Sequence, residues 1–127
     1  METRTNPWTR RLTAVLTVIA ICGLISTAHA GAKSWNDEAI NWMDYEAGLA
    51  AAKEQQKPVC LIFYTSWCPH CTNYAKMFDD EKVVAKSKEF IMIRLDKDKH
   101  PEISKQYRPD GEYIPRTYFL SADGTLA

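Results

Sequence analysis

Two cysteines separated by two residues carry the most specific chemistry in this sequence. Cys68 and Cys71 enclose Pro69 and His70, directly after an apolar run and directly before residues at helical spacing. A disulfide exchanger needs a thiol that ionises near neutral pH, because the thiolate is the attacking species, and a second thiol that displaces the mixed disulfide. The first turn of a helix favours a leading thiolate through unpaired N–H groups and the helix dipole. We therefore predict that Cys68 is an exposed nucleophile and Cys71 a more buried resolving thiol.

The two residues between the cysteines tune this chemistry. Pro69 at an early helical position loses no hydrogen bond, since the first N–H groups of a helix are unpaired, and its fixed φ suits the helix. His70 brings a positive charge close to Cys68 when it is protonated. A stabilised thiolate stabilises the reduced protein, so the histidine favours a more oxidising couple than a neutral residue would give.

A lone pair of cysteines at this spacing can also be half of a zinc site or a purely structural disulfide. Zinc needs two further ligands, and beyond residue 30 only His70 and His100 are available, which form no second spaced pair. A disulfide that closes so short a loop at a helix start stabilises little and stays accessible. We therefore predict no metal and no other cofactor, but a redox-active disulfide between Cys68 and Cys71.

The motif must be held by a strand that precedes it and a helix that follows it. A continuous apolar run at residues 59–64 predicts a central strand buried on both faces. Further strands are expected at residues 40–42, 90–95 and 117–120, and helices at residues 45–55 after Asp44, 71–78, from Asp80 onward, and 101–107. Strands that alternate with helices indicate an α/β domain.

The C-terminal end of the sequence carries a hairpin signal without a complete hairpin. Ala122-Asp123-Gly124 is typical of a tight turn between strands, yet only residues 125–127 follow it. We therefore expect that the last strand and any helix covering it are missing, as in a truncated domain.

The first thirty residues differ in character from the rest. Three arginines precede an uncharged apolar run at residues 12–25, and Ala28-His29-Ala30 matches the A-x-A pattern of a signal-peptidase site. We predict a secretory signal at residues 1–30, cleaved after Ala30, and one domain at residues 31–127 in the periplasm or secreted. A bilayer span needs roughly 20 apolar residues, more than this run of about 14, so no stable membrane insertion is expected after cleavage. The export route, general or twin-arginine, stays open.

The charge composition argues against nucleic acid and anionic membranes as partners, and export limits the states in which the cysteines are expected. Lys and Arg together number 16, as do Asp and Glu, so no overall field favours nucleic acid or an anionic membrane. The cysteines of an exported protein are expected to be paired, buried or reactive. Cys60 lies inside the apolar run and is interpreted as a core residue. Residues 97–99 are interpreted as a solvated charge run, and Trp35, Trp42 and Tyr45 as cover for the core.

The motif and its surroundings resemble a known superfamily. Trp67-Cys68-Pro69-His70-Cys71 at a strand-to-helix turn, with Ile114-Pro115 before a later strand, resembles the thioredoxin superfamily. Lys57-Pro58, Phe78-Asp79-Asp80 and residues 109–116 are similar to the small anterior-gradient-type oxidoreductases of the secretory pathway and their bacterial periplasmic relatives, while the Cys-Pro-His-Cys centre resembles that of the oxidant DsbA. The resemblance spans residues 40–124. It implies a thioredoxin-like fold, a central mixed sheet flanked by helices, here without the last strand and helix.

The resemblance also implies substrate-binding residues. Pro115 would be a cis-proline that faces the active-site sulfurs, and Ile114 would offer its backbone to an extended substrate segment, with Trp67 shaping the adjacent surface. A cis X-Pro bond turns the chain sharply and leaves an unpaired backbone edge beside the nucleophile. The sequence departs from the thioredoxins at Ile62, where they carry a buried acid. Solvent or another group must therefore take the proton of the resolving thiol.

These features predict an enzyme, a thiol:disulfide oxidoreductase that exchanges disulfides with exported proteins through Cys68 and Cys71. Oxidant or isomerase action is favoured, with a membrane or soluble redox partner restoring the enzyme. Two alternatives remain open at this point. One is a periplasmic reductase fed by a membrane electron donor, and the other is a non-catalytic module that holds clients or a copper ion.

Overall fold

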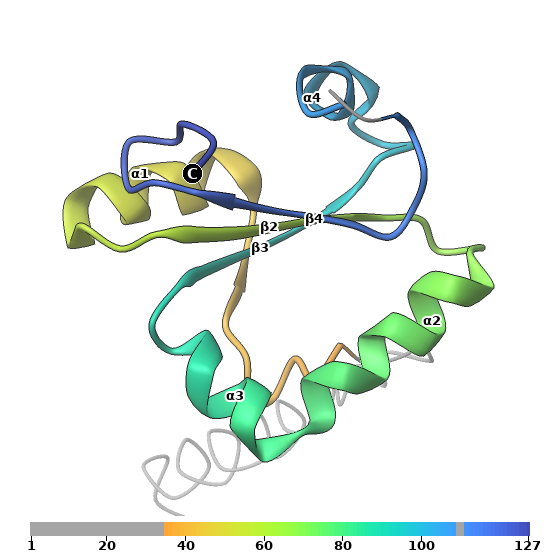
Figure 1. Cartoon of the computed structure of the whole chain (residues 1–127), viewed down its shortest axis with the longest axis horizontal. Coiled ribbons are helices and arrows are strands. Elements are labelled where there is room, and N and C mark those ends of the chain that lie inside the picture. Colours follow the sequence, from red (N-terminus) through yellow and green to blue (C-terminus); the bar gives the residue numbers. More distant parts are fainter. Residues whose placement is uncertain (1–34, 109–110) are drawn as a thin grey trace, which may run out of the picture. The chain divides into compact units, whose positions relative to one another are not determined.

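The computed structural model describes residues 35–108 and 111–127, which alternate between strands and helices (Figure 1). The predicted leader and its cleavage site after Ala30 lie outside the described residues. In chain order the elements are β1 (Trp42–Met43), α1 (Tyr45–Gln55), β2 (Val59–Tyr64), α2 (Pro69–Ala75), the 3₁₀ helix η1 (Lys76–Asp79), α3 (Glu81–Ser87), β3 (Ile91–Asp96), α4 (Pro101–Gln106) and β4 (Arg116–Leu120). This order confirms the predicted α/β class.

The four strands form one mixed sheet in the order β1-β3-β2-β4. β1 and β2 run parallel to β3, and β4 runs antiparallel to β2. The apolar run of β2 occupies the inside of the sheet, where Leu61 pairs with Ile93 on one side and with Tyr118 on the other. A strand with neighbours on both sides and covered faces must be apolar throughout, which explains the continuous pattern at residues 59–64.

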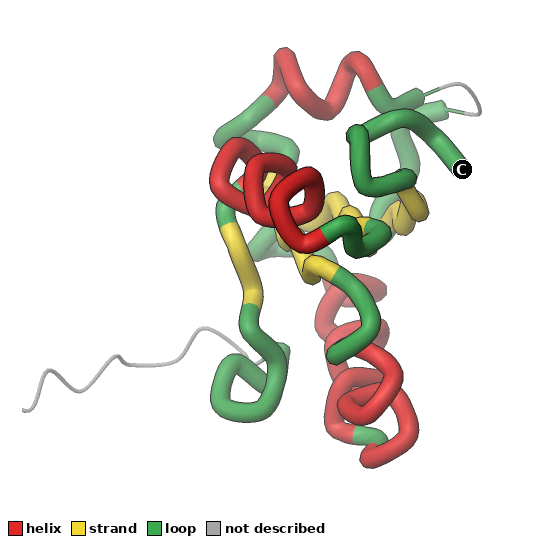
Figure 2. The backbone as a smooth tube through the Cα atoms, turned by 90° about the vertical axis from the view of Figure 1, so that its left-hand side faces the viewer, coloured by secondary structure: helices red, strands yellow, loops and turns green. Residues whose placement is uncertain are grey.

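Helices lie on both faces of the sheet (Figure 2), and two clusters of buried side chains form the cores. α1 and α4 lie on one face, whereas α2 and α3 lie on the other (Figure 1). Successive side chains of a strand point to opposite faces, so Leu61 and Phe63 join the core under α1 and α4, while Cys60 and Ile62 join the core under α2. Trp35 is buried in the second core, with Trp42 packed against it, as expected for residues that cover the sheet.

The ends of the elements agree with the sequence at some positions and differ at others. Asp80 caps α3, because its Oδ1 accepts the N–H groups of Lys82 at 2.8 Å and Val83 at 3.3 Å. Asp44 occupies the N-cap position of α1 but makes no side-chain hydrogen bond there. The first strand begins at Trp42 and not at residue 40, because the Ile40 N–H is engaged by the Asn36 carbonyl in a turn.

The predicted hairpin turn forms after β4. Gly124 has a φ of +88°, a conformation that favours glycine, and Leu120 pairs with Leu126 in an antiparallel bridge. The Ser121 N–H donates to the Thr125 carbonyl and closes the turn. Among the described residues, no helix combines the length and the apolar character needed to cross a bilayer.

Candidate redox-active site

The Cys68 sulfur lies at the start of α2, directly after the central strand. Cys68 is the N-cap residue with extended backbone, and Pro69 takes the first helical position. The Cys71 N–H donates to the Cys68 Sγ at 3.2 Å, and the Thr72 N–H donates to the Cys68 carbonyl. A cysteine sulfur at an N-cap accepts a donor that would otherwise be unpaired, so this geometry favours the Cys68 thiolate.

The expected exposure of Cys68 is wrong, because the residue is only 4% exposed. It belongs to the same apolar cluster as Ile62 and Ala75, and Ile114 packs against that cluster. The cluster brings residues of several elements around Cys68, which the spacing of the cysteines does not reveal. Cys71 is buried as well, and both carry free thiols.

The two thiols have different electrostatic environments. Burial and, to a smaller extent, a hydrogen bond with Cys68 raise the pKa of Cys71 to about 11, while a backbone hydrogen bond involving Thr65 acts in the opposite direction. A thiol with such a pKa is almost wholly protonated at neutral pH and reacts only when a base removes its proton. This asymmetry agrees with an attacking role for Cys68 and a resolving role for Cys71.

Trp67, which precedes the cysteines, and His70, which lies between them, are both at the surface. Trp67 is 68% exposed, and its indole N–H donates to the Asp98 Oδ2 at 2.7 Å. The charge run at residues 97–99 is therefore not merely solvated, because Asp98 fixes the orientation of a ring beside the motif. His70 is exposed on the first turn of α2. Its effect on Cys68 rests on charge and remains a prediction.

The Ile114–Pro115 peptide bond is cis, as the resemblance implies. Both residues are half-buried, and Ile114 packs against the cluster that contains Cys68 and Cys71. The chain segment that enters β4 thus reaches the same end of the sheet as the start of α2. The expected roles of Ile114 and Pro115 toward a substrate remain predictions.

Arg116 is a residue of this region that the sequence pattern did not single out. It follows the cis-proline directly, is 1% exposed, and lies with its guanidinium carbon 5.0 Å from the centre of the Phe63 ring. Its Nη1 donates to the Gly111 carbonyl and its Nη2 to the Ser104 Oγ, both at 2.6 Å. Arg116 thereby ties the segment before β4 to α4. An arginine at the start of an otherwise apolar strand was the available signal.

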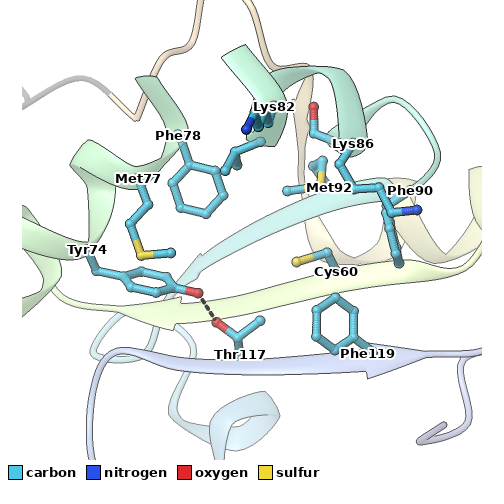
Figure 3. A pocket seen from close by; sticks show the side chains of 12 residues that line it. Cys60, Tyr74, Met77, Phe78, Lys82, Lys86, Phe90, Met92, Thr117 and Phe119 are labelled. Carbon is cyan, nitrogen blue, oxygen red and sulfur yellow. Dashed lines mark hydrogen bonds between the residues drawn. The ribbon is translucent and has the colours of Figure 1, made fainter. Parts of the chain in front are cut away.

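Cys60 belongs to the same buried cluster as the redox pair, and it lines an apolar cavity of about 300 Å³ that neither Cys68 nor Cys71 lines (Figure 3). The cavity lies between β4 and the helices α2 and α3, and a hydrogen bond of 2.8 Å between Tyr74 Oη and Thr117 Oγ1 crosses one end of it. Burial raises the pKa of Cys60 to about 12, which keeps this thiol protonated and inert at neutral pH. The interpretation of Cys60 as a core residue is confirmed. Within the described residues, no three His, Cys, Asp or Glu side chains gather as metal ligands.

Comparison with known protein families gives a match over most of the described chain. A family model described as thioredoxin-like matches residues 41–122. Anterior gradient protein 3 of Xenopus tropicalis is 36% identical over 97 residues, which cover 74% of this chain and 56% of that protein. The human anterior gradient protein 2 homolog is 30% identical over 95 residues, covering 74% of this chain and 53% of the relative. The chain thus spans about half the length of the curated relatives it matches.

Solved structures of other proteins are similar to this chain. A disulphide isomerase from Xylella fastidiosa Temecula1 has a TM-score of 0.57 and 28% identity, over 84% of this chain and 78% of that one. A DsbH oxidoreductase has a TM-score of 0.56 and 25% identity, over 68% of this chain and 69% of that one. Both proteins are similar to this chain in fold and in sequence.

Proposed function

The chain belongs to the thioredoxin-like family of disulfide oxidoreductases and isomerases, and on that premise we propose that it exchanges disulfides with exported proteins through Cys68 and Cys71. One observation carries the proposal. The Cys68 sulfur accepts the Cys71 N–H at the helix start, whereas burial holds the Cys71 thiol protonated. The Cys68 sulfur is thus suited to attack a substrate disulfide and to act as a leaving group, and the Cys71 sulfur to resolve the mixed disulfide.

In the oxidising direction, the chain starts with a Cys68–Cys71 disulfide. A substrate thiolate attacks the Cys68 sulfur, the Cys68–Cys71 bond breaks, and Cys71 leaves as a thiolate that takes up a proton. A second substrate thiolate then attacks the substrate sulfur of the mixed disulfide, and Cys68 leaves as a thiolate stabilised by the Cys71 N–H. The substrate loses two electrons and gains a disulfide, and the chain is left reduced.

The surface around Cys68 supports recognition of an extended protein segment. Trp67 presents a large exposed ring held by Asp98, and the cis bond before Pro115 turns the chain next to the same apolar cluster. An extended segment can pair with a free backbone edge through main-chain hydrogen bonds, which are independent of its sequence. Such binding suits an enzyme with many exported clients. The leader-like residues 1–30 support export to the periplasm or the exterior.

Turnover on protein substrates tests the proposal. The purified chain is mixed with a reduced client and with a client whose disulfides are scrambled, in a glutathione buffer. We expect catalytic amounts of the chain to accelerate disulfide formation or reshuffling above the buffer rate. A chain that binds clients in stoichiometric amounts but leaves their thiol count unchanged would instead be the non-catalytic module, and the proposal would be overturned.

The direction of exchange depends on His70, and its replacement gives a second prediction. His70→Gln removes a side chain that places a positive charge near Cys68 when it is protonated, and loss of that charge destabilises the thiolate and therefore the reduced chain. The reduction potential should fall, by about 30 mV for each 1.4 kcal/mol of lost stabilisation. The potential is measured by equilibration with glutathione, and His100→Gln, another exposed histidine, is the matched control. An unchanged potential in His70→Gln would remove the reason for preferring an oxidant over a reductase.

A further inference from the structure

The resolving thiol needs a base that the central strand does not supply. Burial keeps Cys71 protonated, with a pKa of about 11, so its attack on a mixed disulfide requires removal of the proton. Ile62 is fully buried in β2 and carries no titratable group. The proton acceptor is therefore either solvent or a group on another element that shares a space with Cys71.

Such a space exists beside Cys71. A cavity of about 480 Å³ extends between the end of the sheet and the start of α2. Buried Thr65, Cys71 and Asp96 contribute to its wall, and exposed Trp67 and Lys99 lie at its rim. A cavity of this size with polar walls has room for ordered water.

Two buried polar atoms in this cavity have no hydrogen-bond partner within the described residues. One is the Oγ1 of Thr65, a residue only 2% exposed, and the other is the Nη1 of Arg94. Buried polar atoms in proteins are nearly always paired, with protein groups or with water. The unpaired Thr65 hydroxyl therefore favours ordered water in the cavity that Cys71 also lines. A backbone hydrogen bond also links Thr65 to Cys71.

Asp96 is the carboxylate best placed to act there. It ends β3 in register with Tyr64, the residue before Thr65, and is 8% exposed. Its Oδ1 accepts the Asp98 N–H at 3.0 Å, which leaves Oδ2 as a proton acceptor. Asp37 also lines the cavity, but it is exposed and forms an ion pair of 2.9 Å with Arg94.

We propose that Asp96 is the proton acceptor for Cys71, through water and the Thr65 hydroxyl in the cavity that all three residues line. This inference rests on the proposed exchange function. In resolution, the Cys71 proton passes to the Asp96 carboxylate, the Cys71 sulfur attacks the Cys68 sulfur, and the substrate leaves as a thiolate with the electron pair of the broken bond. In the oxidising direction the protonated Asp96 returns the proton to the leaving Cys71 thiolate.

A chromogenic disulfide separates the two thiol steps. One equivalent of dithiobis(nitrobenzoate) is mixed with the reduced full chain in which Cys22 and Cys60 are replaced by alanine. Attack by Cys68 releases a first nitrothiolate, and attack by Cys71 on the resulting mixed disulfide releases a second. Both phases are followed by absorbance in a stopped-flow instrument. The variants are Asp96→Asn, Asp96→Glu and, as the matched control, Asp37→Asn.

We expect Asp96→Asn to leave the first phase unchanged and to slow the second at pH 7 by roughly 100-fold, the usual scale of general-base catalysis. Asp96→Glu should recover part of the rate, and Asp37→Asn should resemble the parent. In Asp96→Asn the second phase should rise about tenfold per pH unit from pH 7 to 9, because solvent hydroxide then removes the proton. The other ionisable groups around the cavity, Asp37, Tyr64, Arg94 and Lys99, are the same in the parent and the variant.

The sign of the effect distinguishes a base from a nearby charge. A carboxylate that acted only through its charge would disfavour the Cys71 thiolate, so its removal would speed the second phase. A second phase that is unchanged or faster in Asp96→Asn, or equally slow in Asp37→Asn, overturns the inference. If Asp96→Asn does not fold, Thr65→Val, which removes only the relay hydroxyl, must show the slow second phase. Absence of the first phase in the parent would instead contradict the proposed function.

Discussion

Replacement of Cys68 by serine is expected to reduce disulfide exchange to the uncatalysed rate. Serine keeps the size of the side chain but supplies no thiolate, so no mixed disulfide forms. Replacement of Cys71 by serine has a different expected result, because Cys68 still attacks and nothing displaces the substrate from it. Cys71→Ser should therefore accumulate covalent complexes with client proteins, while Cys68→Ser should form none. Non-reducing electrophoresis and intact mass measure both outcomes.

A control is needed because the chain contains a third thiol in its folded part. Cys60 has a pKa raised to about 12 by burial and should neither trap clients nor support exchange. Cys60→Ala is therefore expected to exchange disulfides like the parent. Complexes that form equally through Cys68 and Cys71 would contradict the assignment of the two roles, whereas complexes through Cys60 would show that the core opens during turnover.

The local parts of the fold were predictable because their causes are local. The apolar run at residues 59–64 matches β2 residue for residue, since a strand between two others admits no polar face. Asp80 was identifiable as a cap because the N–H groups that its side chain accepts lie only two and three residues further along the chain. Before the first strand, a turn in which the Ile40 N–H donates to the Asn36 carbonyl keeps Ile40 out of the sheet. The alternation of apolar and polar residues at positions 40–42 does not indicate this turn.

The parts of the site that depend on long-range contacts were not predictable in the same way. The bond from Trp67 to Asp98 joins residues 31 positions apart, and the ion pair of Arg94 with Asp37 joins residues 57 apart. The spacing of residues in the sequence predicts neither of these two contacts. Cys68 is likewise buried in a cluster several of whose other members, such as Trp35 and Met92, lie far from it in the sequence. The cis bond at Pro115 was expected from resemblance and not from periodicity.

Arg116→Met should lower the free energy of unfolding by roughly 3 kcal/mol. The substitution leaves the hydroxyl of buried Ser104 without its donor, and a buried unsatisfied group costs about 1–3 kcal/mol, whereas the carbonyl of exposed Gly111 can pair with water instead. The stacking of the guanidinium on Phe63 is lost as well. Part of this cost is offset, because Met replaces a buried charge whose Nε has no hydrogen-bond partner among the described residues. Chemical denaturation measures the change. Arg108→Met is the control, since its ion pair with Glu112 lies at the surface, where such pairs contribute little.

The same substitution should also weaken client binding, because Arg116 holds the segment that carries Ile114 and Pro115 against α4. At temperatures below the unfolding transition, we expect the KM for a protein client to rise. The rate at which Cys68 reacts with a small disulfide should stay the same, because a small disulfide does not bind the segment at Ile114 and Pro115. Arg116→Lys keeps the charge but cannot donate to Gly111 and Ser104 in fork geometry, so it should fall between the parent and Arg116→Met. Equal stability of Arg116→Met and Arg108→Met, or equal losses for client and small disulfide, would show that Arg116 does not position the substrate-binding segment.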